Sequence, residues 1–344
     1  MLPEADLLRV ATRSAGHLER FRNATILITG ASGFFGRWMV ESLMTANREL
    51  SLGVRCIAHA SRRSESVRQP DLGGAVRWVF GDVEELPVLL QRANLGDTDI
   101  HAIVHLAVSA GTGTGGPQPF HVFGSAVGGA LAVLALARRT SGCRVLMTSS
   151  GAVYGRQPTE LEAIPETALS VADPLDCDDA YGAGKRAMEF LAAAAVKEFG
   201  TEVMIARPFA FIGPRLPLDR NFAAGNFMAN ALRGEPIVIA GKGTALRSYL
   251  YAEDLAVWLW ALLGSGVPGR AYNVGASSAV SILELANTIA EQVQTGVIVR
   301  GQEINEARPA YVPDVRRIKA ELGVIESVGL SEAVRRTIEW RRHQ

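Results

Sequence analysis

Cysteine, net charge and long apolar runs are all scarce in this 344-residue chain, and each scarcity excludes a class of protein. The three cysteines, Cys56, Cys143 and Cys177, are too few and too widely spaced for a disulfide framework or a metal-binding knuckle, which fits a reducing compartment. The 35 basic and 35 acidic residues cancel, so no overall field attracts nucleic acid or an anionic membrane. Any anionic ligand must therefore be bound by local groups.

The longest uncharged apolar stretch covers residues 122–137, and these 16 residues include three glycines. A membrane-spanning helix needs about 20 apolar residues, so the stretch predicts a buried helix instead. Residues 1–20 mix acidic and basic side chains without an unbroken apolar core, which argues against a signal peptide. We expect a cytoplasmic protein with no membrane partner and no nucleic-acid partner.

The sequence has ample material for a core, because 48% of its residues are hydrophobic. Apolar runs rich in β-branched residues alternate with helical patterns and are nearly continuous, as in strands covered on both faces. The pattern predicts an α/β fold with a parallel sheet. The expected strands are 24–29, 54–59, 76–80, 102–106, 144–148 and 202–206, and the expected helices are 34–47, 84–93, 122–140 and 181–199.

Beyond residue 207 the pattern becomes shorter and less regular, with Pro208, Pro214 and Pro217 in one loop. We therefore expect three parts: an N-terminal extension over 1–23, whose role the sequence does not indicate, a nucleotide-binding domain over 24–206, and a smaller α/β lobe over 207–344. Chain segments are expected to cross between the two larger parts.

A glycine-rich turn follows the first expected strand. Gly30 permits the tight turn, Gly33 lets backbone amides approach a pyrophosphate, and Gly36 lets the next helix lie close to the strand. A glycine triplet alone is weak evidence. Its place between a first strand and a first helix predicts a dinucleotide site.

The end of the second strand bears on the choice of cofactor. Proteins that bind NAD usually have an acid there for the ribose 2′-hydroxyl, whereas this chain has Ser61, Arg62 and Arg63. Two guanidinium groups can instead pair with a 2′-phosphate. The sequence favours NADP, with NAD as the alternative.

A candidate catalytic set lies at the end of the fifth strand and the start of the following helix. Ser150 follows the strand, and Tyr181 and Lys185 share one helix face because they are four residues apart. An ammonium group can lower the pKa of a phenol, and a serine hydroxyl can hydrogen-bond a reacting oxygen. This set suits hydride transfer at a carbon that carries a hydroxyl group.

From about residue 24 to residue 323, these motifs resemble the extended short-chain dehydrogenase/reductase superfamily, in its NAD(P)-dependent nucleotide-sugar epimerase/dehydratase branch. The resemblance implies a Rossmann-type doubly wound parallel sheet with a smaller C-terminal α/β substrate-binding lobe, and a homodimer. It also implies that Tyr181 is the acid/base, Lys185 its partner and Ser150 the group that polarises the substrate oxygen, with Ser149 as a weaker alternative. The implied cofactor-binding residues are Gly30, Gly33, Phe34, Phe35, Gly36, Ser61, Arg62, Arg63, Asp82, Val83, Leu106, Ala107, Val108, Tyr181, Lys185 and Pro208.

The second lobe has matching positions of its own. Asn226, Arg247 and Arg308 resemble the family's contacts to the substrate diphosphate, and Ser150 is expected to contact the sugar. Guanidinium groups can hold phosphate oxygens by charge-assisted hydrogen bonds. The implied substrate is a nucleoside diphosphate sugar.

The chain departs from the family where dehydratases and decarboxylases have an acid directly after the catalytic hydroxyl residue. Gly151 and Ala152 stand there, and neither can move a proton. Dehydration and uronate decarboxylation are therefore disfavoured, which leaves 4-epimerisation and NADPH-dependent reduction of a 4-keto sugar. A non-catalytic NAD(P)-binding protein is the alternative from another class, and the intact Ser150, Tyr181 and Lys185 argue against it.

Overall fold

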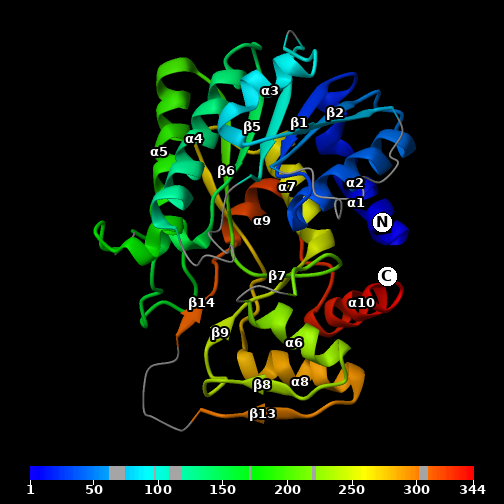
Figure 1. Cartoon of the computed structure of the whole chain (residues 1–344), viewed down its shortest axis with the longest axis vertical. Coiled ribbons are helices and arrows are strands. Elements are labelled where there is room, and N and C mark those ends of the chain that lie inside the picture. Colours follow the sequence, from blue (N-terminus) through cyan, green and yellow to red (C-terminus); the bar gives the residue numbers. More distant parts are fainter. Residues whose placement is uncertain (62–73, 97, 108–117, 170–171, 219–221, 302–308) are drawn as a thin grey trace.

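The computed structural model describes residues 1–61, 74–96, 98–107, 118–169, 172–218, 222–301 and 309–344 (Figure 1). A seven-stranded sheet with helices on both faces forms the upper part of Figure 1, and a smaller lobe of short strands and helices lies below it. Every pair of neighbouring strands in the large sheet is parallel. The predicted doubly wound α/β fold is confirmed.

The large sheet has the strand order β11-β6-β5-β4-β1-β2-β3. Its central strands β1, β4 and β5 are buried along their whole length, which explains their continuous apolar sequences. The strands are β1 (Thr25–Thr29), β2 (Arg55–Ala60), β3 (Val76–Phe80), β4 (Ala102–His105), β5 (Arg144–Thr148), β6 (Glu202–Pro208) and β11 (Ala271–Val274).

Successive side chains of β1 enter separate cores on the two faces of the sheet. Ile26 and Ile28 belong to one core, and Leu27 belongs to the other. The first core includes residues of α2 (Phe34–Glu49) and α7 (Ala252–Ser265). The second includes residues of α3 (Leu86–Arg92), α4 (Pro119–Ala137) and α5 (Ala180–Phe199).

The N-terminal extension is part of the first core. Its helix α1 (Glu4–Leu18) packs against α2 and α7 and leads through η1 (Glu19–Phe21) to β1. The Tyr251 hydroxyl donates to buried Asp6 at 2.6 Å, and Arg13 pairs with buried Asp254 at 2.7 Å. Residues 1–23 thus cover a face of the sheet domain.

The smaller lobe is built from two- and three-residue strands packed with helices. Its core joins α6 (Ala223–Leu232), α8 (Ile282–Val293) and α10 (Leu330–Arg342). Both α7 and β11 come from beyond residue 207 yet join the sheet domain, so the chain crosses between the two parts. The remaining elements are β7 (Phe211–Ile212), β8 (Ile237–Ile239), β9 (Leu246–Arg247), β10 (Leu250–Tyr251), β12 (Val280–Ser281), β13 (Val297–Val299), β14 (Ala310–Tyr311) and α9 (Arg316–Leu322).

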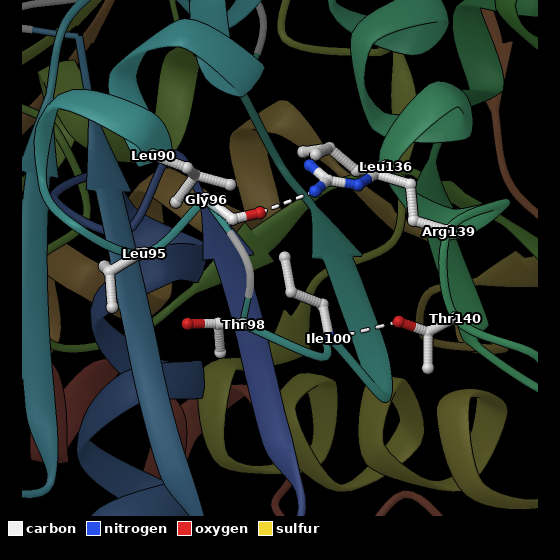
Figure 2. A pocket seen from close by; sticks show the side chains of 8 residues that line it. All are labelled: Leu90, Leu95, Gly96, Thr98, Ile100, Leu136, Arg139 and Thr140. Atoms are coloured by element: carbon white, nitrogen blue, oxygen red, sulfur yellow. Dashed lines mark hydrogen bonds between the residues drawn. The ribbon is translucent and has the colours of Figure 1, made fainter.

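Helix α4 is long and apolar enough to cross a membrane by composition alone, but it packs against α5 and β4. It begins at Pro119, three residues before the expected start, because proline is favoured in the first turn of a helix. Figure 2 shows a hollow where Arg139 donates to the Gly96 carbonyl oxygen at 2.6 Å. Ile100 lines this hollow and precedes β4, so the hollow lies at the amino edge of the sheet.

Candidate active site

The glycine turn joins β1 to α2 with almost no space between them. Gly30 has a φ of +66°, which favours glycine. A Cβ atom on Gly36 would lie 2.1 Å from the Gly30 carbonyl oxygen. Among the described residues, no side chain caps the first turn of α2, where Phe34 and Phe35 follow Gly33. The turn therefore leaves backbone amides available to an anion, which fits a pyrophosphate.

The strand register brings the other predicted cofactor residues to the same edge. Thr29 at the end of β1 is paired with His59 of β2 and His105 of β4. The backbone amides of Leu106 and Ala107 donate to the Thr29 hydroxyl at 3.1 and 3.2 Å. This edge is the carboxyl end of the parallel sheet, where such folds bind ligands.

Further predicted cofactor residues lie along the same edge. Ser61 directly follows β2, and Asp82 and Val83 follow β3, where Asp82 precedes the short helix η2 (Val83–Glu85). Pro208 ends β6. Arg62, Arg63 and Val108 lie outside the described residues, and so does Arg308.

Tyr181, Lys185 and Ser150 come together at the end of β5. Ser150 caps η3 (Gly151–Tyr154), and its Oγ accepts a hydrogen bond from the Ala152 amide at 3.1 Å. Lys185 Nζ donates to the Thr148 carbonyl oxygen at 2.5 Å and lies 5.7 Å from the centre of the Tyr181 ring. Helix α5 thus places both side chains beside the strand end that carries Ser150.

The electrostatics of this group are set mainly by burial. Burial raises the pKa of the Tyr181 phenol, and a hydrogen bond with the Ser150 side chain lowers it. Burial lowers the pKa of Lys185 to about 7, because a buried ammonium group is poorly solvated. Ser150 therefore opposes the effect of burial on the pKa of Tyr181.

The two serines at the end of β5 differ in their surroundings. The backbone amide of Ser149 donates to the Ala206 carbonyl oxygen at 2.7 Å, as in a continuing sheet. The Ser149 Oγ atom is buried and has no hydrogen-bond partner within the described ranges. Ser150 alone of the two hydrogen-bonds Tyr181. The geometry favours Ser150 over Ser149 as the hydroxyl that polarises the substrate oxygen.

A buried network holds the segment after Ser150, and sequence reasoning missed it. The Tyr154 hydroxyl donates to Asn273 Oδ1 at 2.7 Å and accepts from Arg207 at 2.7 Å. Arg207 also makes two hydrogen bonds to Glu189 on α5, at 2.9 and 2.7 Å. Arg207 therefore ties η3 to the helix that carries Tyr181 and Lys185.

The structure does not bring together the residues expected at the substrate diphosphate. Arg247 lies on β9, where its guanidinium donates to the Leu246 carbonyl oxygen at 2.7 Å. Asn226 is exposed on α6. In the part of the chain that the structure describes, only Arg247 is linked to the catalytic group, through Tyr311.

Tyr311 on β14 is the site residue with no signal in the sequence motifs. Its ring lies 5.8 Å from the Arg247 guanidinium carbon and packs at 4.5 Å on the Phe209 ring. A hydrogen bond with the Ser150 side chain lowers the pKa of Tyr311, as it does for Tyr181. The pairing of β14 with β9, together with a bridge between Pro313 and Ile164, brings this distant residue to the site.

Comparison with known proteins decides the family. The model of the NAD dependent epimerase/dehydratase family matches residues 26–275. The chain belongs to this family. UDP-glucuronic acid decarboxylase 3 of Arabidopsis thaliana is 30% identical over 313 residues, which cover 91% of this chain and 87% of that protein.

Solved structures of the family show the same fold. The UDP-glucose 4-epimerase of Thermotoga maritima, solved with UDP-glucose, has a TM-score of 0.78 at 21% identity and is matched over 93% of this chain and 99% of its own. The dTDP-glucose 4,6-dehydratase of Bacillus anthracis, solved with NAD, has a TM-score of 0.78 at 18% identity over 93% and 97%. Family members of different reaction types thus share this architecture.

Proposed function

We propose that this family member catalyses NAD(P)-dependent hydride transfer at C4 of a nucleoside diphosphate sugar, and that it interconverts 4-epimers through a 4-ketone. The observation that carries the proposal is the group formed by Ser150, Tyr181 and Lys185 at the carboxyl edge of the sheet. Tyr311, whose strand β14 pairs with the strand β9 that carries Arg247, links this group to the smaller lobe.

The reaction follows from the position of each side chain. Tyr181 removes the proton of the C4 hydroxyl and returns it when the ketone is reduced. Ser150 hydrogen-bonds the same oxygen and stabilises the charge that develops on it. Lys185, held on the Thr148 carbonyl, supplies positive charge beside the phenol when it is protonated. A nicotinamide cofactor held at the glycine turn would supply the acceptor and donor of the C4 hydride.

Position 151 supports epimerisation over dehydration. Gly151 and Ala152 follow Ser150 and carry no ionisable group. Oxidation at C4 needs one acid/base group, whereas dehydration needs a further group to remove water from the sugar. The described residues directly after Ser150 offer no such group.

A second candidate is NADPH-dependent reduction of a 4-keto sugar. Its support is the end of β2, where Ala60 and Ser61 stand in place of an acid for the ribose 2′-hydroxyl. NAD is the cofactor in the solved dehydratase complex, so the two candidates differ in cofactor as well as reaction.

The test is incubation of the purified protein with NAD⁺ and, in turn, UDP-glucose, UDP-glucuronic acid and dTDP-glucose. We expect the 4-epimer of one of them, at unchanged mass, and no epimer from Tyr181→Phe. A product that has lost CO₂ or water, without an epimer, would contradict the proposal. Consumption of NADPH with a 4-keto sugar only would establish the second candidate.

Mass spectrometry of the nucleotide released by heat denaturation tests the cofactor. Stoichiometric NAD⁺ supports an epimerase that recycles its cofactor. It rejects the interpretation that Arg62 and Arg63 bind a 2′-phosphate. An empty site that takes up NADPH in preference to NADH supports the reductase.

We also propose that two copies associate through α4 and α5. Phe120, Phe123 and Leu131 on α4 and Phe190 on α5 are exposed apolar side chains on these two packed helices. Light scattering should give the mass of two 36.8 kDa chains for the wild type and of one for Phe190→Glu. A wild-type protein with the mass of one chain would reject the dimer.

A further inference from the structure

Tyr311 enters the catalytic group from the smaller lobe, at the position that a side chain on residue 151 would occupy. A Cβ atom placed on Gly151 would lie 2.4 Å from the Tyr311 hydroxyl oxygen and 2.8 Å from Cζ. Phe209, whose ring packs at 4.5 Å on Tyr311, would lie 2.9 Å from the same Cβ atom. Glycine at 151 and the phenol of Tyr311 therefore depend on each other.

The hydrogen-bonding capacity of Ser150 limits what its hydroxyl can do. A serine hydroxyl has one proton to donate and two lone pairs that accept. The Ala152 amide donates to one lone pair at 3.1 Å. Tyr181 and Tyr311 are the remaining partners of the Ser150 side chain in the described part of the chain.

The surroundings of Tyr311 keep its phenol protonated. Burial raises the pKa of Tyr311, and the nearby Tyr181 phenol raises it further, while the Ser150 hydrogen bond opposes both effects. Ionisation of Tyr181 during the reaction therefore keeps Tyr311 protonated. A protonated phenol at this place donates its hydrogen bond.

We propose that Tyr311 is a positioning residue for the reaction: its hydroxyl donates to the second lone pair of Ser150 Oγ, so that the Ser150 proton is directed toward Tyr181 and the substrate C4 oxygen. This inference rests on the proposed function. With both lone pairs of Ser150 occupied, the hydroxyl can act only as a donor, which is the role that stabilises negative charge on the reacting oxygen.

The same residue connects the reaction to substrate recognition. Tyr311 is paired with Arg247 in the β9–β14 ladder, and the Arg247 guanidinium carbon lies 5.8 Å from its ring centre. A nucleoside diphosphate held by Arg247 thus contacts the element that orients Ser150. The arrangement also leaves no room for a carboxylate side chain at position 151, which separates this chain from enzymes that need one there.

Tyr311→Phe tests the proposal, because it removes the hydroxyl and keeps the ring. With UDP-glucose and NAD⁺, we expect kcat to fall about tenfold while KM changes less than about threefold. When kcat is measured against pH, the lower apparent pKa should be higher in this variant than in the wild type. The reason is that a freely rotating Ser150 hydroxyl lowers the pKa of Tyr181 less than an oriented one does. Tyr272→Phe is the matched control, since it removes a buried hydroxyl that bonds Glu321 far from the site, and it should leave the profile unchanged.

A titration without substrate separates failure of this proposal from failure of the proposed function. Tyrosinate absorbance is followed against pH in each protein, and the signal of its Tyr181→Phe counterpart is subtracted. Tyr311→Phe should raise the midpoint assigned to Tyr181, even if UDP-glucose proves not to be a substrate. Gly151→Ala, which displaces the Tyr311 hydroxyl, should raise it as well. A wild-type midpoint in both folded variants would overturn the proposal.

Discussion

The sheet side and the lobe side of the candidate site are built differently. Lys185 is 2% exposed on a 20-residue helix packed against the sheet. Arg247 and Tyr311 lie on paired strands of two residues each. A group held on long, buried elements keeps a fixed geometry, which the reaction requires, whereas short strands let the lobe adjust to a ligand. Changes on the sheet side should therefore affect the rate, and a change of Arg247 on the lobe side should affect binding. Tyr311 is the lobe residue that should affect the rate, because it lies beside Ser150.

The largest expected effect is on the sheet side. Tyr181→Phe should lower kcat by about 10²- to 10⁴-fold, because it removes the acid/base group and keeps the ring. The binding of NAD(H), measured by calorimetry, should stay within about threefold of the wild type. Retention of the wild-type rate would remove Tyr181 from the mechanism.

The glycine turn gives the largest expected effect on stability. Gly36→Ala should lower the free energy of unfolding by about 3 kcal/mol or more, since its Cβ atom would lie 2.1 Å from the Gly30 carbonyl oxygen. Gly124→Ala on α4 is the matched control, because a Cβ atom there meets open space and should stabilise the helix by about 0.5 to 1 kcal/mol. Urea denaturation measures both. Equal effects would show that the turn is not tightly packed.

On the lobe side, Arg247→Ala should weaken binding more than catalysis. We expect KM for the nucleoside diphosphate sugar to rise about 10- to 100-fold, as for loss of a charge-assisted hydrogen bond, with a smaller fall in kcat. Arg233→Ala is the control, since Arg233 forms an exposed ion pair with Glu235, and it should change KM by less than about twofold. A fall in kcat with KM unchanged would contradict the assignment of Arg247 to substrate binding.

The effect that is smallest over a single pH unit is the dependence of stability on pH through Lys185. Its pKa is about 7 in the folded protein against 10.5 in the unfolded chain, so between these values the unfolded state binds a proton that the folded state does not. This group therefore makes stability rise with pH over that window, by at most about 1.4 kcal/mol per pH unit. Urea unfolding at several pH values should show a shallower rise for Lys185→Met. Parallel curves for the two proteins would mean that the folded protein leaves this pKa unshifted.

The sequence predicts the sheet side far better than the lobe side, for a physical reason. Continuous apolar strands and a glycine turn are local patterns, and a parallel sheet brings its strand ends to one edge, so Ser150, Tyr181 and Lys185 are found together. Six strands and four helices follow the expected pattern with small differences at their ends.

The elements that escaped prediction depend on contacts between distant segments. The helix α1 joins the sheet domain from before β1, and the strand β11 joins it from beyond residue 207. Tyr311 reaches Ser150 because β14 pairs with β9 and Pro313 is bridged to Ile164, and no spacing rule encodes such short pairings. Local motifs therefore gave the reacting group but not the residue that positions it.

The central claim is that hydride leaves C4 of a nucleoside diphosphate sugar, and isotope transfer tests it most directly. UDP-glucose, UDP-glucuronic acid and dTDP-glucose deuterated at C4 are incubated with the protein and NAD⁺, and both the sugar and the cofactor are analysed by mass spectrometry and NMR. The account predicts that deuterium passes to the nicotinamide during turnover and returns to C4 with inverted configuration. Turnover in which the C4 deuterium never reaches the cofactor would contradict it.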